Sequence, residues 1–383
     1  MAGFEFETRL RLALREAAER EAERGRAGRA VARSRSTWVV TRRSFVPAAA
    51  AVLATVLALS VAVVFLTRSG SQREALQPPE VVARFTLGES PGGTLGAYGS
   101  VWVADKGPGR LLRVDPESRR VTVRLPVEGD VAMEPAGGTL WALNARVPPS
   151  ELGDLLLGID PASNDITARL RLRTPSGAPA LGVDLAADQN SFWILGQTAS
   201  WYRSNSLGLI RLTPQDRRAT VAFVLPGGSG RVGIALRRDG VWAITADDRL
   251  LRYDARTGEQ LSETRLDLPA TGRDTEPAPG KLRFAGDTLV TSIPGGLAGI
   301  DPYTGRVVWR RHLGVTVNAW TEARGVIWAA VAQGPDRLVA IQPNDGRVAT
   351  SVGLDTFSTA GIASVGDQLW VTTQGGEAIV LQR

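Results

Sequence analysis

Residues 99–125 read GSVWVADKGPGRLLRVDPESRRVTVRL, and the order of strand and turn residues in this stretch decides the fold. An apolar strand around Trp102 is followed by a Gly/Pro loop, an apolar strand that ends at Asp115-Pro116, and a strand of alternating polarity. Apolar residues recur with a period of two, which is typical of β-strands, and helical periodicity is absent. The stretch therefore predicts three antiparallel strands joined by short turns.

The same unit recurs to the end of the chain, and in each copy a short strand bounded by glycine precedes the Trp strand. The positions equivalent to Trp102 are 38 to 52 residues apart, which is the size of a propeller blade. Radial repetition of four-stranded sheets buries both faces of each sheet, so we predict an all-β fold, a seven-bladed β-propeller. The seven equivalent positions are Trp102, Trp141, Trp193, Trp242, Val290, Trp328 and Trp370.

The seventh copy ends at Arg383 after its third strand, whereas residues 81–87 form a strand that no copy uses. We predict that this N-terminal strand completes the seventh blade and closes the ring as 3+1. The propeller then covers residues 81–383. Rings of six or eight blades need strands that the sequence lacks.

Residues 99–125 and the stretch DQLWVTTQGGEAIVL (367–381) resemble the YVTN/virginiamycin B lyase-like propellers of bacteria. The resemblance covers about residues 81–383 and implies the fold, but propellers host unrelated activities, so it implies little about function. The stretch GLAGIDPYTGRVVWRRHLG (296–314) resembles one repeat of quinoprotein-type propellers and their outer-membrane assembly relatives, with Trp309 as the docking Trp. Only this blade shows that pattern, which argues against a quinone cofactor.

Residues 45–66 read FVPAAAAVLATVLALSVAVVFL, and no charged residue lies between Arg43 and Arg68. At ~1.5 Å rise per residue, a helix of this length crosses the ~30 Å hydrocarbon core of a bilayer. We predict a single transmembrane helix, a signal anchor over residues 44–67, followed by a linker over residues 68–80.

Residues 1–43 carry eleven Arg and six Glu, a net charge of +5 out of the +6 of the whole chain. The positive-inside rule places this head, with its short helix, in the cytoplasm and the propeller outside it. The basic character therefore indicates topology and predicts no nucleic-acid partner. Thr41–Val46 resembles the twin-arginine export motif, so two interpretations stay open, a retained anchor and a segment that directs twin-arginine export. The head resembles the N-termini of actinobacterial anti-sigma-type membrane proteins, which implies a cytoplasmic regulator as a partner.

The sequence contains few residues that are suited to catalysis. The chain has no cysteine and a single histidine, His312, at the end of an outer strand. Asp115, Asp160 and Asp301 precede proline and fit turn chemistry, and the repeated Trp fits packing between blades. We predict no catalytic residue, no metal and no cofactor.

The loops that follow each Trp strand and the loops between blades converge on one face, where we expect binding. Adjacent aromatic and Arg side chains are typical of recognition hot spots. The predicted binding residues are Trp201, Tyr202 and Arg203 in the third blade, Asn144 and Arg146 in the second, and Glu134, Arg231, Arg273, Asp274, Asn318, Trp320 and Asp355 around the central mouth. We predict a binding module for a protein, peptide or cell-wall ligand. The alternatives are a lyase- or hydrolase-like enzyme and a signalling receptor.

Overall fold

The computed structural model describes residues 76–382 except 128–129, 146–153, 175–176, 189–191, 199–206, 213–218, 226–231, 239, 270–280, 316 and 333. The predicted head (1–43) and transmembrane helix (44–67) lie outside the described residues. Within the described part, no helix has the length and apolarity needed to cross a membrane.

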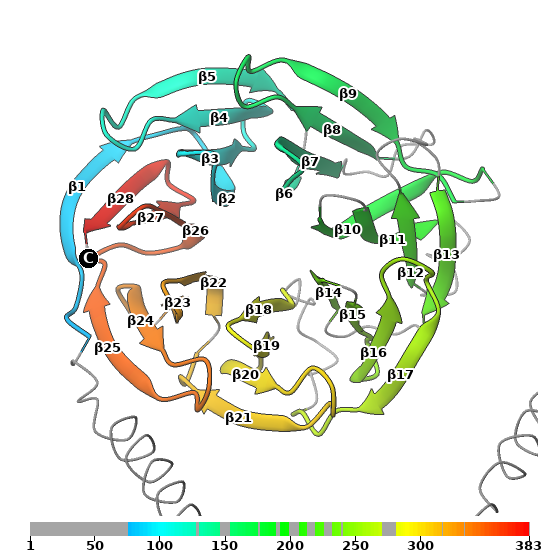
Figure 1. The fold of residues 1–383 in the computed structure, drawn as a ribbon. Coiled ribbons are helices and arrows are strands. Elements are labelled where there is room, and N and C mark those ends of the chain that lie inside the picture. Colours follow the sequence, from blue (N-terminus) through cyan, green and yellow to red (C-terminus); the bar gives the residue numbers. More distant parts are fainter. Residues whose placement is uncertain are drawn as a thin grey trace, which may run out of the picture. The chain divides into compact units, whose positions relative to one another are not determined.

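The described residues form seven four-stranded antiparallel sheets arranged around a central axis (Figure 1), which confirms the seven-bladed propeller. Blade one contains β2 (Pro91–Ala97), β3 (Ser100–Asp105), β4 (Arg110–Val114) and β5 (Val121–Pro126). Blade two contains β6 (Asp130–Ala136), β7 (Thr139–Ala145), β8 (Leu155–Ile159) and β9 (Ile166–Arg171). Blade three contains β10 (Ala180–Ala187), β11 (Phe192–Thr198), β12 (Leu207–Leu212) and β13 (Ala219–Leu225). Blade four contains β14 (Gly233–Arg237), β15 (Gly240–Ile244), β16 (Arg249–Asp254) and β17 (Gln260–Arg265).

The second half of the ring repeats this order. Blade five contains β18 (Arg283–Ala285), β19 (Thr288–Ile293), β20 (Gly296–Ile300) and β21 (Val307–His312). Blade six contains β22 (Val317–Ala323), β23 (Val326–Val331), β24 (Arg337–Ile341) and β25 (Val348–Gly353). Blade seven contains β26 (Thr359–Val365), β27 (Gln368–Thr373), β28 (Glu377–Gln382) and β1 (Glu80–Thr86).

The ring closes as 3+1, as the sequence predicts. β1 pairs antiparallel with β28, from Glu80 opposite Gln382 to Thr86 opposite Glu377. The ring of Phe85 on β1 meets Trp370 edge-on, with 5.8 Å between ring centroids. The N-terminal strand therefore supplies both backbone pairing and apolar contact to the last blade.

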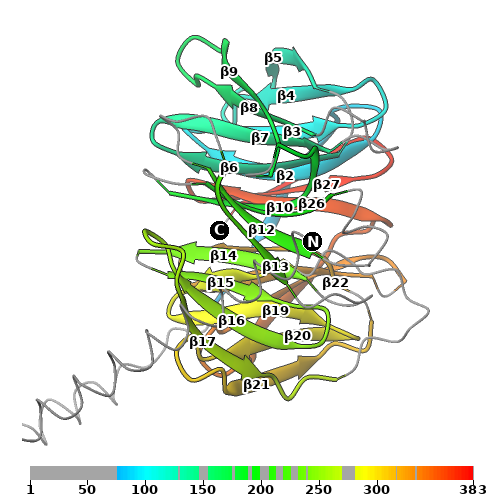
Figure 2. The ribbon, with the colours of Figure 1, turned by 90° about the vertical axis from the view of Figure 1, so that its right-hand side faces the viewer.

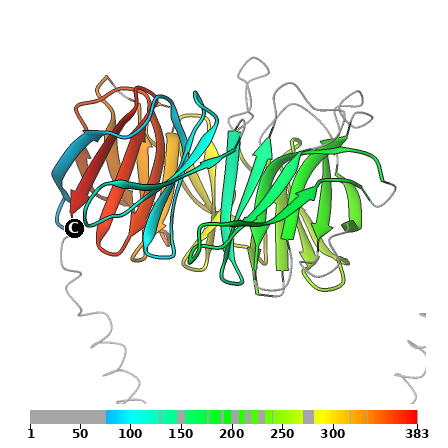
Figure 3. The ribbon, with the colours of Figure 1, turned by 90° about the horizontal axis from the view of Figure 1, so that it is seen from above.

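The first strands of the seven blades line the central channel, as Figure 1 shows. Because the strands within each blade are antiparallel, the loop between the second and third strands emerges on the same face as the connection to the next blade. We call this the loop face, and the opposite one, which carries the remaining hairpin turns, the turn face (side views in Figures 2 and 3). Since β1 takes a fourth-strand place, its start at Glu80 lies on the turn face.

The repeated Trp side chains pack between blades, as predicted. Trp102, Trp193, Trp242, Trp328 and Trp370 are at most 1% exposed, and Trp141 is 7% exposed. The indole Nε1 of Trp242 donates a hydrogen bond of 2.7 Å to the carbonyl of Pro302 in the next blade. The Asp-Pro turns are capped as expected. Oδ1 of Asp115 accepts the N–H of Ser118 at 2.6 Å, and Oδ1 of Asp301 accepts that of Thr304 at 2.8 Å.

Blade five departs from this pattern, because Val290 takes the Trp place. Trp309 on the outer strand β21 fills the same interface, opposite Gly299, where a Cβ would collide with the indole. Trp309 is 7% exposed, and its Nε1 donates to the carbonyl of Pro343 at 2.6 Å. The large aromatic ring has thus moved from the second strand to the fourth and still docks on the turn of the next blade.

Candidate functional site

Each blade places one residue of its channel-lining strand opposite the Trp position. This residue always precedes the Trp position by seven in the sequence. We call these residues the inner layer: Leu95, Glu134, Ala186, Ala235, Arg283, Thr321 and Ala363. Five of the seven side chains are uncharged. The two charged ones, Glu134 and Arg283, have opposite sign and lie on blades two and five.

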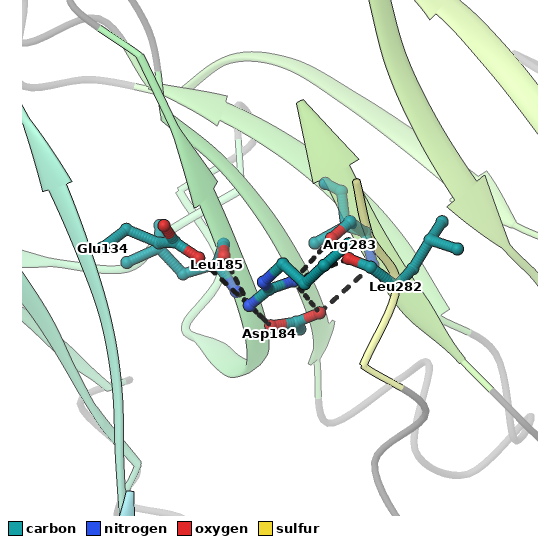
Figure 4. Close-up of polar contacts among 6 residues, drawn as sticks. Glu134, Asp184, Leu185, Leu282 and Arg283 are labelled. Atoms are coloured by element: carbon teal, nitrogen blue, oxygen red, sulfur yellow. Dashed lines mark hydrogen bonds and ion pairs between the residues drawn. The ribbon is translucent and has the colours of Figure 1, made fainter. Parts of the chain in front are cut away.

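Arg283 reaches both Glu134 and a second acid, Asp184 of blade three (Figure 4). Its Nη2 lies 3.1 Å from Oε1 of Glu134 and 3.1 Å from Oδ1 of Asp184. Its Nη1 donates to Oδ2 of Asp184 at 3.3 Å, so the guanidinium holds this carboxylate through both nitrogens. We call these three residues the channel cluster.

Backbone groups of blade four complete the channel cluster. Nη1 of Arg283 donates to the carbonyl of Ile234 at 2.8 Å, and Oδ2 of Asp184 accepts the N–H of the same residue at 3.1 Å. The channel-lining strands β6, β10, β14 and β18 are therefore joined through one guanidinium. Such a charge-assisted network fixes the positions of four successive blades.

The channel cluster contains two carboxylates, of Glu134 and Asp184, and one guanidinium, of Arg283. Burial raises the pKa of Glu134 above its ordinary value, although the positive charges of Arg283 and Lys281 oppose this shift, and the nearby Asp184 adds to it. Burial by itself would lower the pKa of Arg283, but Asp184 and Glu134 reverse that effect and raise it. Arg283 is thus the main positive charge that compensates Glu134.

A cavity of about 210 Å³ lies beside the channel cluster. Apart from Glu134 and Arg283, its lining is apolar: Ala186, Ala187, Ala235, Leu236 and Phe284. The small inner-layer residues of blades three and four leave this space between the two charged positions. Pockets for drug-sized ligands enclose at least ~300 Å³, so the cavity fits one small group.

The opposite side of the channel is packed through glycine. A Cβ at Gly93 would lie 2.7 Å from the carbonyl oxygen of Val131 on β6, and one at Gly361 would lie 2.7 Å from that of Gly92 on β2. The channel-lining strands of blades seven, one and two therefore approach each other closely. Among the inner-layer residues, the two charged side chains lie on blades two and five, and the cavity beside the channel cluster is lined by residues of blades two to five.

A second feature lies on the loop face, in the connection between blades six and seven. Phe357 is 65% exposed there, between Asp355 and Ser358, which both have positive φ, 47° and 63°. The buried Asp336 fixes the loop, because its Oδ2 accepts the N–H of Thr359 at 2.7 Å and its own N–H donates to the carbonyl of Thr356 at 2.7 Å. An ordered loop thus presents a large aromatic side chain to solvent.

The structure places five of the predicted binding residues within described segments. Glu134 belongs to the channel cluster, and Asp355 is exposed on the loop face beside Phe357. Asn144 is 3% exposed and Trp320 5% exposed, so neither lies at the mouth; because side chains alternate along β22, Trp320 turns into the core between blades five and six. The backbone of Asn318 is part of β22. Outside the described residues lie Trp201, Tyr202, Arg203, Arg146, Arg231, Arg273 and Asp274.

Sequence reasoning missed Arg283 and Asp184. Arg283 carries a usable signal, because it stands seven residues before Val290 just as Glu134 stands seven before Trp141. Asp184 carries no such spacing signal. It follows a bulge in β10, where the pairing register shifts between Gly182 and Asp184. His312 is exposed at the end of β21, and no cluster of metal-ligating side chains occurs in the described part of the chain.

Comparison with protein families gives a partial match. The family model of the outer membrane protein assembly factor BamB matches residues 246–383, less than half of the chain. This region contains residues 296–314, so the expected likeness to outer-membrane assembly propellers is confirmed there, and the match extends beyond that one blade. The likeness to YVTN/virginiamycin B lyase-like propellers stays a prediction. A comparison with curated protein sequences finds no match.

Solved structures share the fold at low sequence identity. The β-propeller domain of Cps50 (Swd1) from Myceliophteria thermophila has a TM-score of 0.58 at 13% identity, over 80% of this chain and 100% of that one. BamB from Moraxella catarrhalis has a TM-score of 0.51 at 14% identity, over 80% and 100%. A chain of the Mitotic Checkpoint Complex has a TM-score of 0.57 at 13% identity, over 92% and 98%. At such identities the similarity shows the propeller fold alone.

Proposed function

We propose that this chain is a membrane-anchored, extracytoplasmic propeller whose loop face binds a protein partner. The observation that carries the proposal is Phe357, an aromatic side chain that is 65% exposed on a loop fixed by the buried Asp336. Aromatic anchors held in place before binding contribute strongly to protein interfaces, because little conformational entropy is lost on association. Asp355 beside it adds a charge that can orient the partner.

The similar propellers support a protein partner. The matching family model describes an outer membrane protein assembly factor, and one similar structure is a chain of a mitotic checkpoint complex. The first description names a factor that acts on other proteins, and the second names a complex of proteins. The apolar stretch 45–66 and the basic head support the membrane anchor and its orientation.

The topology of the propeller determines the face on which its first strand starts. The first strand, β1, starts on the turn face, so a linker that ends at Glu80 joins the propeller opposite its loop face. Phe357 and Asp355 lie on the loop face, opposite the face on which β1 starts.

Site-specific photo-crosslinking in the full-length chain tests this proposal. A photoreactive phenylalanine analogue is placed at Phe357 or, as a matched control, at Tyr303, which is 64% exposed in a turn on the other face. We expect a discrete protein adduct in intact cells from position 357 and none from position 303. Adducts from 303 alone, or from neither position, would contradict binding through the loop face.

The same cells report the orientation. Protease added to spheroplasts should digest the propeller and leave an epitope at residue 2 intact. A protected propeller would overturn the extracytoplasmic assignment.

A further inference from the structure

The cavity beside the channel cluster combines apolar walls with charged groups. Its walls are the aliphatic side chains of Ala186, Ala187, Ala235 and Leu236 and the ring of Phe284, while charged groups gather where Glu134 and Arg283 meet. At about 30 Å³ per water molecule, 210 Å³ corresponds to roughly seven waters. That space suits the end of one long side chain better than a folded ligand.

Arg283 is poorly placed to hold an additional anion. Its two terminal nitrogens already contact Asp184, the carbonyls of Ile234 and Leu282, and Glu134. An incoming anion would also meet the negative charges of Asp184 and Glu134 at ion-pair distance from that guanidinium. The existing partners of the guanidinium therefore disfavour an acidic guest.

Glu134, by contrast, has acceptor capacity to spare. Among the described residues its ion pair is made by Oε1 with Nη2 of Arg283, whereas an ionised carboxylate offers about four lone-pair sites. Its side chain keeps 21% of its exposed area, so a group in the cavity can reach it. The raised pKa of Glu134 agrees with this. Burial disfavours the negative charge, and the positive charges of Arg283 and Lys281 offset that effect only in part.

A long cationic side chain fits both the apolar walls of the cavity and the spare acceptor capacity of Glu134. Lys and Arg carry an aliphatic stem that packs on apolar walls and a charged end that seeks an anion. The stem would lie against Ala235, Leu236 and Phe284, and the charged end would reach the carboxylate of Glu134. We propose that the cavity beside the ion pair of Glu134 and Arg283 binds the cationic end of a Lys or Arg side chain that a peptide segment of the partner inserts into the channel.

This inference rests on the proposed function only in that the partner supplies the segment. The test uses small probes and needs no identified partner, so its failure would leave binding through the loop face untouched. If position 357 gives no adduct but the probes bind, the cavity site stands without the loop face.

The experiment is calorimetric titration of the full-length chain at pH 7 with four capped amino acids. Nα-acetyl-lysine methylamide and Nα-acetyl-arginine methylamide carry the cation, the citrulline derivative is a neutral isostere of the arginine one, and the glutamate derivative is the anion. We expect the two cationic probes to bind, and the neutral and anionic probes to bind at least tenfold more weakly. Tenfold corresponds to about 1.4 kcal/mol.

Three variants assign the site. Glu134→Gln keeps the shape and removes the charge, and should weaken the binding of the cationic probes at least tenfold. Ala235→Leu fills the cavity without changing a charge, and should abolish binding. Glu117→Gln removes one negative charge from an exposed turn outside the cavity, and should leave binding unchanged.

Several outcomes overturn the inference. These are no binding of either cationic probe, equal binding of citrulline and arginine derivatives, preference for the glutamate derivative, or unchanged binding in both Glu134→Gln and Ala235→Leu. Should Glu134→Gln fail to fold, judged by its melting temperature, Ala235→Leu decides alone.

Discussion

Arg283 of blade five and Glu134 of blade two form an ion pair of 3.1 Å between the two charged positions of an otherwise uncharged layer around the channel. Asp184 shares the same guanidinium, and β14 of blade four bonds to both Arg283 and Asp184 through the backbone of Ile234. Four consecutive blades thus depend on one side chain. Blades seven, one and two use close glycine packing instead, so the two sides of the ring should respond differently to mutation.

Removing the guanidinium should destabilise the propeller strongly. Arg283→Met leaves Asp184, which is 8% exposed, without its bidentate partner. Breaking a buried ion pair on one side typically costs about 3–5 kcal/mol, because a buried charge is left uncompensated. Urea unfolding of the full-length chain measures this loss as a lower midpoint at unchanged slope.

The double variant Arg283→Met/Asp184→Asn separates charge from packing. If the cost arises from the stranded carboxylate, the double variant should recover part of the stability lost in Arg283→Met. A double variant that is as unstable as the sum of both single variants would show that the two residues act independently.

Glu134 should make the propeller less stable as pH rises. Burial raises its pKa in the folded protein above the ~4.3 of an unfolded chain. The unfolded chain therefore releases this proton first, so the stabilising contribution is complete below about pH 4.3 and is lost as pH rises through the folded-state pKa. The melting temperature of wild type minus that of Glu134→Gln should fall between pH 4 and pH 7. A difference that grows with pH would contradict the raised pKa.

In blade five, the packing of Trp309 on Gly346 of the next blade should be measurable as coupling. Gly346 has φ of 66°, and a Cβ there would lie 2.6 Å from the indole. Trp309→Ala should cost about 3–5 kcal/mol through the cavity that it leaves. Gly346→Ala should cost less in that background than in wild type, because the steric part of its effect disappears and only the backbone part remains. Equal costs in both backgrounds would place the ring elsewhere.

The sequence predicts those parts of this fold that repeat. Trp102 and its equivalents could be recognised because every blade needs the same packing between sheets, and residues 81–87 because the last copy lacks one strand. The channel cluster could not be read in this way, since it consists of departures from the repeat that come together only when the ring closes. The sequence places Glu134 at the central mouth, yet its partner Arg283 can be recognised only when the residue seven positions before each Trp position is compared across blades. The expected place of Trp320 at the mouth is wrong, because the sequence pattern assigns Trp320 to a connection between blades, whereas it lies on β22, where strand alternation buries it.

The closure of the ring by β1 gives the last prediction. Deleting residues 80–87 removes the partner of β28 from Glu377 to Gln382 and the contact of Phe85 with Trp370. The unpaired edge would expose backbone donors and acceptors together with apolar side chains, and such edges promote association between chains. Deletion of residues 80–87 should therefore lower the melting temperature and produce aggregates in size-exclusion chromatography. Phe85→Ala, which keeps the backbone pairing, should lower the melting temperature without aggregation, and a deletion variant that melts like wild type would show that the ring does not need this strand.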